Sequence, residues 1–347
     1  MEELFVTYLK ERLPLVERAL ADAADEPLAD GAVSDDLVRY LYAPLRRFTA
    51  SGGKRVRPVL ALLGAESVGG RAEDALSCAV AVELFQSAAL IHDDIADEGE
   101  LRRGEPCLHR VEGEGLAINA GDLALTQVFE VVLRDESLSA ERKLRALDEL
   151  VRMERHTLEG QALDLGWVRD GRWDVTSEDY LYMVTSKTAW YSAAIPLYVG
   201  AIVGGGSDEA ARGLLEGGLT AGVAFQLADD LLNLVGDARA QGKDFRSDIT
   251  EGKRTLAVVW ALEHLDAASR EELVALLGSS ATDPTELARA VELIGQGGGI
   301  EHCRTLAGQM AERAKEGATG LAEAGHITVE ARDLLLSMSD FFVERAS

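Results

Sequence analysis

Apolar residues recur at the spacing of an α-helix along almost all of the 347-residue chain. In segments such as "KLRALDELVRMERHTLEGQ" an apolar side chain returns about every third or fourth position, and no segment shows the strict alternation of a half-buried strand. Ala and Leu dominate these positions and only 7 residues are proline, a composition that suits helix interiors. The pattern predicts an all-α fold of about a dozen helices.

The breaks between these segments are short clusters of Gly, Pro, Ser and Asp, and none has the length of an interdomain linker. We therefore expect residues 1–347 to form a single helical domain. Two segments, residues 81–92 and 216–228, are apolar on nearly all sides, as is typical of helices at the centre of a bundle. Each of the two ends directly before a pair of aspartates.

Charge and cysteine content limit the function classes. The chain has 60 acidic and 35 basic side chains, a net charge of −25, which argues against attraction to nucleic acid or an anionic membrane. Cys78, Cys107 and Cys303 are far apart in the sequence, so we expect neither a disulfide framework nor a thiolate metal site. The N-terminus does not resemble a signal peptide, and no stretch has the ~20 uninterrupted apolar residues of a spanning helix. We expect a soluble, cytoplasmic protein without a transmembrane segment.

Both aspartate pairs belong to clusters of oxygen-bearing side chains with the spacing i, i+1 and i+4. The clusters are Asp93, Asp94 and Asp97, and Asp229, Asp230 and Asn233. Like charges one turn apart destabilise a helix, and carboxylates beside a buried apolar helix need a cation to neutralise them. Oxygen ligands without His or Cys favour Mg²⁺. The clusters therefore predict the two halves of a metal-diphosphate site, although either cluster alone would also fit a solvated acidic helix end.

A diphosphate also requires basic donors, and four segments provide them. In "SGGKRVRPVL", two glycines allow close backbone approach at the start of a helix, whose N-terminal amides favour anions. The basic candidates are Lys54, Arg55, Arg57, Arg102, Arg103, Lys187, Lys243, Lys253 and Arg254. Lys187 interrupts an apolar helix, so an ion pair with a core carboxylate is the alternative interpretation of that residue.

Taken together, these segments resemble the successive signatures of the all-trans polyprenyl diphosphate synthase family, the chain-elongating isoprenyl transferases. The signatures, in matching order between about residues 45 and 305, are "GGKRVRP", "LIHDDIADEGELRRGEPCLH", "GDLAL", "TSKTA", "FQLADDLLNLVGD" and "GKDFRSDITEGKRTL". The resemblance implies the isoprenoid synthase type I fold, with helices around a central apolar cavity, and usually a homodimer. It also implies an enzyme, a Mg²⁺-dependent prenyltransferase that condenses isopentenyl diphosphate with an allylic diphosphate.

The resemblance also assigns roles to residues. The two acidic clusters would bind Mg²⁺, three ions when diphosphate is bound, and through them the allylic diphosphate. Residues expected to contact the allylic diphosphate are Arg102, Lys187 and Lys253, and Lys243 is a further substrate-binding candidate. Residues expected to hold the diphosphate of isopentenyl diphosphate are Lys54, Arg57, Gln86 and Arg103. Residues expected at the reacting centre are Thr188 and Gln226, beside Lys187 and Lys253.

The implied chemistry is ionisation of the allylic C–O bond, attack by isopentenyl diphosphate and loss of a proton to the departed diphosphate. No side-chain base is required, so His92 is expected to pack at the helix end or to donate a hydrogen bond behind the site. Asp164 in "EGQALDLG" lies either beside the carbocation or in a core cap. Asn233 departs from the family, where a third aspartate is common, but its amide oxygen can still bind metal and Asp237 could contribute. Gln86 stands where many members have histidine.

Product length in this family depends on how soon a bulky side chain blocks the channel along the helix of the first cluster. Ala89 and Ala88, four and five residues before Asp93, cannot block it. Phe85 lies about 12 Å from Asp93 along the helix and is the first candidate for a floor, although it could be an ordinary core residue. Phe129 could be a second stop. We expect geranylgeranyl diphosphate, with farnesyl diphosphate and products of C25 and above as alternatives.

Two rival functions remain at this stage. A terpene synthase of the same fold would usually lack the GGKR segment and the second aspartate pair, both of which are present. A non-catalytic subunit of a two-component synthase would have lost metal ligands, and only Asn233 favours it.

Overall fold

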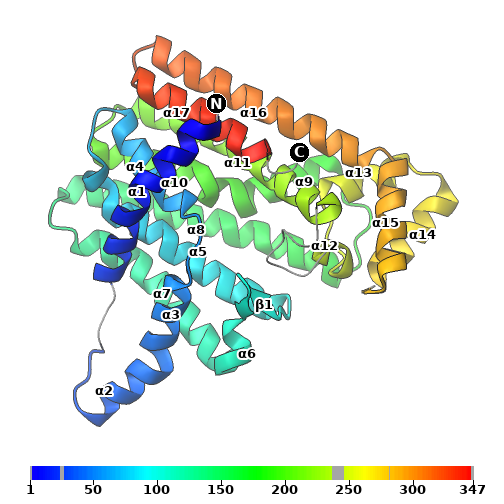
Figure 1. Cartoon of the computed structure of the whole chain (residues 1–347), viewed down its shortest axis with the longest axis horizontal. Helices are drawn as coiled ribbons and strands as arrows, with labels where there is room; N and C mark the ends of the chain where they lie inside the picture. Colours follow the sequence, from blue (N-terminus) through cyan, green and yellow to red (C-terminus); the bar gives the residue numbers. More distant parts are fainter. Residues whose placement is uncertain (1, 24–26, 237–245, 281, 345–347) are drawn as a thin grey trace.

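A computed structural model describes the chain at residues 2–23, 27–236, 246–280 and 282–344. Figure 1 shows a bundle of helices, with α16 and α17 along one side and α2 projecting from the opposite side. The helices of the first half are α1 Glu2–Asp22, α2 Ala32–Leu37, η1 Val38–Tyr42, α3 Ala43–Ala50, α4 Val56–Ser67, η2 Ala72–Ala75, α5 Leu76–Ala96, α6 Leu108–Glu112, α7 Glu114–Arg134 and α8 Ala140–Arg169. Those of the second half are α9 Ser177–Val184, η3 Thr185–Ala194, α10 Ile195–Gly204, α11 Asp208–Val235, α12 Ser247–Thr250, α13 Leu256–His264, α14 Ala267–Gly278, α15 Pro284–Gln296, α16 Gly299–Glu323 and α17 Val329–Val343.

The predicted all-α class is confirmed, but the described residues form more helical segments than the expected dozen. Short helices such as α6 and α12 account for part of the difference. The rest arises because continuous helices are divided by changes of hydrogen-bonding pattern: α2 leads through the π-helix η1 into α3, η2 leads into α5, and α9 leads through the π-helix η3 into α10. Hydrophobic spacing cannot predict such a change, since the apolar residues continue through it.

The two strands among the described residues form a hairpin immediately after the first acidic cluster. Leu101–Arg102 (β1) pairs antiparallel with Glu105–Pro106 (β2). The two connecting residues, Arg103 and Gly104, have φ of 56° and 83°. Positive φ at both central residues is the requirement of a type I′ turn, whose twist suits a two-residue hairpin. The hairpin turns the chain back so that Arg102 and Arg103 return toward the helix end.

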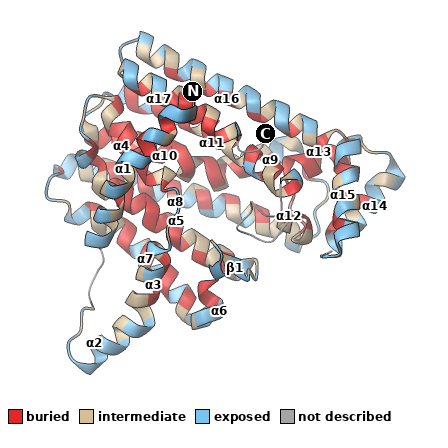
Figure 2. Cartoon of the chain, viewed as in Figure 1, coloured by how far each residue is buried: buried red, intermediate tan, exposed pale blue. Residues whose placement is uncertain are grey.

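The centre of the bundle depends on close helix approach. Figure 2 shows buried residues concentrated on α4, α5, α10 and α11, whereas α2 and α14 are largely exposed. A Cβ atom at Gly64 of α4 would lie 2.2 Å from the Leu197 carbonyl oxygen, and one at Gly200 of α10 would lie 2.0 Å from the Ala61 oxygen. The backbones of α4 and α10 therefore touch, which only glycine permits at these positions.

Two stretches are long and apolar enough to cross a membrane, judged by length and composition alone. They are Ala72–Ala96, which comprises η2 and α5, and Glu114–Arg134, which is α7. In the first, 67% of the apolar window is buried inside the protein, against 39% in α7. Burial in the core accounts for the apolar character of α5, whereas α7 leaves an apolar face less covered.

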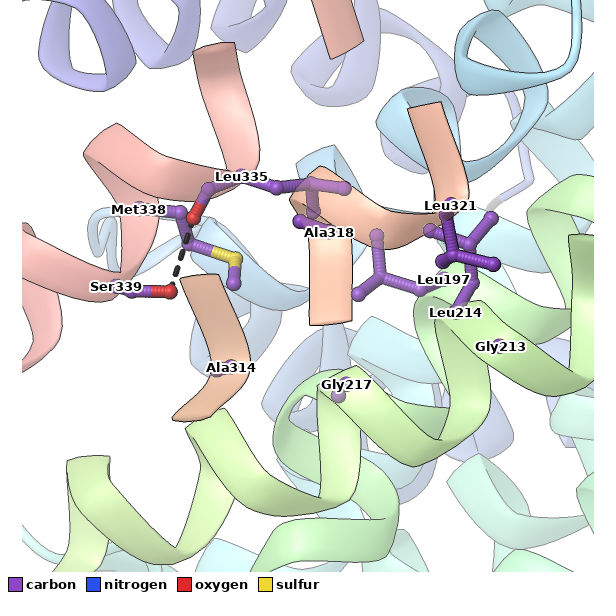
Figure 3. A pocket seen from close by; sticks show the side chains of 11 residues that line it. Leu197, Gly213, Leu214, Gly217, Ala314, Ala318, Leu321, Leu335, Met338 and Ser339 are labelled. Atoms are coloured by element: carbon purple, nitrogen blue, oxygen red, sulfur yellow. Dashed lines mark hydrogen bonds between the residues drawn. The ribbon is translucent and has the colours of Figure 1, made fainter. Parts of the chain in front are cut away.

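A small pocket lies between α10, α11, α16 and α17, and Figure 3 shows the side chains that line it. Its lining includes Gly217, Ala314 and Ala318 but none of the predicted metal or substrate residues. It is therefore not the product cavity that the family resemblance implies.

Substitution of Gly217 by alanine should stabilise the protein. A Cβ atom at this position would meet nothing within 4 Å, and alanine in a helix interior is favoured over glycine by about 1 kcal/mol. We expect thermal unfolding to show a midpoint raised by roughly 1–2 °C. The matched variant Gly200→Ala must force α10 away from α4 and should destabilise by about 1–3 kcal/mol. Equal midpoints for the two variants would contradict this account of the core.

Candidate functional site

The first acidic cluster lies at the C-terminal end of α5. Asp93 and Asp97 are partly exposed, whereas Asp94 is buried. Oδ1 of Asp94 accepts a hydrogen bond of 2.9 Å from Nε of Arg102 and a second from Nη2 of the same residue. The hairpin β1–β2 thus returns Arg102 to the cluster that precedes it. Asp94 faces this arginine, while Asp93 and Asp97 lie nearer the surface.

A glutamine that the sequence analysis missed holds Asp93. Nε2 of Gln161, on α8, donates a hydrogen bond of 2.5 Å to Oδ1 of Asp93. Gln161 precedes Asp164 by one helical turn in "EGQALDLG", a segment in which we considered only Asp164. The spacing i, i+3 on one helix face was the available signal.

The second acidic cluster lies near the C-terminal end of α11 and has a similar division of roles. Asp229 is exposed and Asp230 is buried. Oδ2 of Asp230 accepts a hydrogen bond of 2.5 Å from the Tyr180 hydroxyl, and Oδ1 accepts one of 2.7 Å from Gln226. Burial raises the pKa of Asp230, and these two donors oppose the rise. Tyr180, on α9, was not predicted, because no local pattern connects it with α11.

Asn233 contacts α12. Its Nδ2 donates to Oγ of Ser247 over 3.2 Å, and its Oδ1 accepts from the backbone N–H of Asp248 over 3.3 Å. The amide therefore connects the end of α11 to the segment that carries Lys253. A carboxylate could accept from the Asp248 N–H but could not donate to Ser247.

The two lysines share one carboxylate. Nζ of Lys187 lies 2.6 Å from Oδ2 of Asp164, and Nζ of Lys253 lies 3.4 Å from the same oxygen and 3.1 Å from Oδ1 of Asp97. Burial opposes the charge on Lys187, but Asp164 and Asp93 outweigh it and raise its pKa. Burial likewise opposes the charge on Asp164, and the two lysines lower its pKa. The ion pair considered for Lys187 is therefore present, and Asp164 is its partner.

Asp164 lies near both acidic clusters. Lys253 connects it to Asp97 of the first cluster, and its negative charge acts on Asp230 of the second. The lysine segment η3 is a ten-residue π-helix, an arrangement found frequently at functional sites. Gly160 of α8 lets η3 approach closely, since a Cβ atom there would lie 2.3 Å from the Lys187 backbone nitrogen.

A second group of basic residues, separate from Lys187 and Lys253, surrounds the start of α4. Nη2 of Arg57 donates to the Tyr191 hydroxyl over 3.0 Å and to Oγ of Ser192 over 2.9 Å. With its amide oriented to suit its neighbours, Gln86 accepts a hydrogen bond of 3.2 Å from Nη1 of Arg57. Arg103 donates to Oγ of Ser51 over 3.0 Å and to the carbonyl of Gly52. The ammonium of Lys54 lies 5.6 Å from the ring centre of Phe341.

Arg55 has a different role from the arginines beside it. It adopts φ of 47°, which directs its fully buried side chain into the core, where it pairs with Glu17 and Glu83. The segment "GGKRVRP" thus divides its basic residues: Arg55 connects α1, α4 and α5, whereas Arg57 contacts η3 through Tyr191 and Ser192.

The remaining predicted residues are distributed over the site and its surroundings. Thr188 is buried on η3, one residue after Lys187. His92 packs at the helix end, its Nε2 lying 3.4 Å from the Ile118 carbonyl oxygen. Lys243 and Asp237 lie outside the described residues. Within the described part of the chain, no group of three or more His, Cys, Asp or Glu side chains is arranged so that it could hold a metal ion by itself.

The chain-length candidates separate into two groups. Phe85 is buried and contacts Tyr191 edge-on, with ring centres 5.7 Å apart. Phe129 is partly buried against the same hydrophobic cluster. Ala89 is partly exposed, whereas Ala88 is fully buried in a different cluster formed by α3, α5, α6 and α7. Of the two alanines, only Ala89 has the exposure expected of a channel wall.

Replacement of Asp164 by asparagine should destabilise the fold. The change leaves two largely buried ammonium groups without their shared carboxylate, which costs about 3 kcal/mol. Because the pKa of Asp164 is lowered, its stabilisation is fully present above the ordinary carboxyl pKa of about 4 and is lost as pH falls through the lowered value. Urea denaturation at pH 7 measures the difference. Asp174→Asn, which removes the exposed pair with Arg172, is the control and should change stability by less than about 0.5 kcal/mol.

The chain is similar to known proteins over nearly its whole length. Over residues 38–294 the chain matches the Polyprenyl synthetase family. It is 40% identical over 330 residues to the short chain isoprenyl diphosphate synthase of Methanothermobacter thermautotrophicus, covering 94% of this chain and 97% of that protein. It is 38% identical over 354 aligned positions to the geranylfarnesyl diphosphate synthase of Natronomonas pharaonis, covering 95% and 98% of the two.

Solved structures agree with the sequence relatives. The crystal structure of geranylgeranyl pyrophosphate synthetase from Pyrococcus horikoshii superposes with a TM-score of 0.86 and 34% identity, covering 99% of this chain and 98% of that one. The similarity spans the whole arrangement of helices that brings the acidic and basic residues together. The chain therefore belongs to the polyprenyl synthetase family of prenyltransferases.

Proposed function

We propose that this prenyltransferase condenses isopentenyl diphosphate with an allylic diphosphate, head to tail, and that its main product is geranylgeranyl diphosphate. The observation that carries the proposal is that Asp164, which holds Lys187 and Lys253, lies near both acidic clusters. Two clusters of carboxylates near fixed ammonium groups are suited to binding a diphosphate through metal ions. A terpene synthase or a non-catalytic subunit explains less, because the second basic group around Arg57 would have no ligand.

We propose Mg²⁺ as the metal, with three ions when diphosphate is bound. Oxygen-only donors fit this ion, which takes one or two carboxylates together with water and substrate phosphate. Asp93, Asp97 and Asp229 are the exposed or partly exposed carboxylates, and they would be the ligands. Asp94 and Asp230 are buried and held by protein donors, so they would orient Arg102 and Gln226. Bound Mg²⁺ would supply positive charge that stabilises the leaving diphosphate.

The protein's own groups would complete this charge. Arg102, Lys187 and Lys253 would surround the allylic diphosphate and stabilise the charge that develops as its C–O bond breaks. Lys54, Arg57, Gln86 and Arg103 would hold isopentenyl diphosphate at the start of α4, and Lys243 would add a further contact. Thr188 and Gln226 would lie beside the reacting carbons, and the departing diphosphate would accept the proton.

Incubation with Mg²⁺, labelled isopentenyl diphosphate and dimethylallyl, geranyl or farnesyl diphosphate tests this function. We expect label in a prenyl diphosphate, mostly of twenty carbons, and no label without a divalent metal. Asp93→Asn should lower kcat/KM on the order of 10²-fold or more, whereas Glu98→Gln, at the exposed end of the same segment, should leave it unchanged. No incorporation by the wild type with any primer would refute the proposal.

The proposed product length is inferred from the residues of α5 that precede the first acidic cluster. Ala89 would leave the channel open near the metals, which disfavours a farnesyl product. Phe85 with Tyr191 forms a bulky pair about 12 Å from Asp93 along the helix. The similarity to a geranylfarnesyl synthase makes a longer product the alternative.

Phe85→Ala should therefore lengthen the product. Removal of the ring opens space at the end of the channel, so we expect part of the product to reach twenty-five carbons or more. Separation of labelled products by chain length measures the change, and Phe48→Ala, in a different cluster, controls for general loosening. An unchanged distribution would show that Phe85 is an ordinary core residue.

We also propose a homodimer that uses α7. Only 39% of its apolar window is buried within the chain, and Ile118 and Leu133 are 44% and 56% exposed. A second copy would cover this face. Sedimentation should give twice the chain mass, and Ile118→Glu should halve it; a monomeric wild type would refute the dimer.

A further inference from the structure

The carboxyl group of Glu83, on α5, lies inside the core, and no step of the proposed chemistry uses it. Its side chain is 1% exposed, and its Oε1 accepts a hydrogen bond from Nη1 of Arg55. Burial raises the pKa of Glu83, and the positive charges of Arg55, Arg103 and Arg57 oppose the rise. Two of these arginines, Arg57 and Arg103, are among the residues proposed to hold isopentenyl diphosphate. Glu83 therefore lies close to this part of the proposed site.

The second oxygen of Glu83 determines the orientation of Gln86. The two residues are three positions apart, so they lie on the same face of α5. In the orientation that suits both neighbours, Nε2 of Gln86 donates a hydrogen bond of 3.2 Å to Oε2 of Glu83, and the amide oxygen accepts one of 3.2 Å from Nη1 of Arg57. An ionised carboxylate only accepts hydrogen bonds, and a guanidinium only donates them. The amide nitrogen therefore has to face Glu83, and the amide oxygen has to face Arg57.

Both arginines of "GGKRVRP" thus depend on Glu83. Nη1 of Arg57 is held by Gln86, and its Nη2 is held by side chains of η3. Arg55 pairs with Glu83 directly, and its Nε lies 2.8 Å from a carboxylate oxygen of Glu17 on α1. Arg55 has φ of 47° and immediately precedes α4. Its pair with Glu83 therefore also fixes the start of the helix that carries Arg57.

We propose that Glu83 is a positioning residue for the proposed isopentenyl diphosphate site, where it sets the orientation of Gln86 and, through it, that of Arg57. This inference rests on the proposed function. A guanidinium held in one orientation can bind a diphosphate with two parallel hydrogen bonds, whereas a mobile one loses part of that affinity to ordering. The effect should fall on isopentenyl diphosphate, because the lysines proposed to contact the allylic diphosphate are held by Asp164 instead.

Steady-state kinetics with Mg²⁺, isopentenyl diphosphate and farnesyl diphosphate test the inference. Glu83→Gln keeps the size of the side chain but removes its charge, so the amide of Gln86 loses a charged acceptor and is able to turn. We expect KM for isopentenyl diphosphate to rise on the order of tenfold, with kcat and KM for farnesyl diphosphate within about twofold of the wild type. Calorimetric titration of isopentenyl diphosphate without a primer, when no condensation can occur, should show the same loss of affinity.

Glu17→Gln is the matched control. Glu17 is the other carboxylate that pairs with Arg55, and its side chain is 41% exposed, so both Michaelis constants should stay unchanged. Glu83→Asp keeps the charge beside Arg55 but withdraws it from Gln86 by one methylene, and KM for isopentenyl diphosphate should rise on the order of threefold. This variant tests the inference even if the loss of charge prevents Glu83→Gln from folding.

A folded Glu83→Gln or Glu83→Asp variant with the wild-type KM and affinity for isopentenyl diphosphate would overturn the inference. An equal rise of both Michaelis constants would also overturn it, because Glu83 would then contribute only to the stability of the bundle. Failure of the proposed function is distinguishable, because the wild type itself would then bind no isopentenyl diphosphate and form no prenyl diphosphate with any primer.

Discussion

Carboxylates placed at the ends of buried apolar helices must be neutralised, and the rest of the site is arranged around this requirement. The protein supplies internal hydrogen-bond donors to one carboxylate of each aspartate pair. Arg102 binds Asp94, and Tyr180 and Gln226 bind Asp230. Asp93, Asp97 and Asp229 remain toward solvent. Each cluster therefore combines a fixed inner carboxylate with outer carboxylates that are accessible to a ligand.

Asp164 couples this arrangement to the basic residues. Its single buried carboxylate holds Lys187 and Lys253, which come from segments far apart in the chain. The close approach of Gly160 to η3 makes the first of these pairs possible. The two ammonium groups lie close to the outer carboxylates Asp93 and Asp97, which gives a site of mixed charge. A diphosphate and its metals can pair with these groups of both signs. The helix α8 contributes both Gln161 and Asp164, so it orients the acidic and the basic parts of the site together.

The sequence was sufficient for the helical class, the two acidic clusters and most of the basic residues, because each leaves a local pattern. An aspartate pair at the end of an apolar run, or a lysine inside one, is visible within a few turns. The division of roles within each pair was not visible. Nor were two residues that hold aspartates of these pairs, Tyr180 at Asp230 and Gln161 at Asp93, which lie 50 and 68 positions from their partners. Arg55 and Arg57 were likewise indistinguishable until the positive φ of Arg55 directed its side chain into the core. The π-helix η3 could not be predicted either, since its apolar residues continue those of α9 and α10.

The central claim is that both acidic clusters act together to bind a diphosphate through Mg²⁺. Calorimetric titration with an unreactive allylic diphosphate analogue tests it most directly, in Mg²⁺ and again in excess EDTA. We expect binding in Mg²⁺ to be at least about tenfold tighter than in EDTA, and Asp97→Asn and Asp229→Asn each to remove most of that difference. Equal affinity with and without the metal, or a loss confined to one of the two variants, would contradict the account.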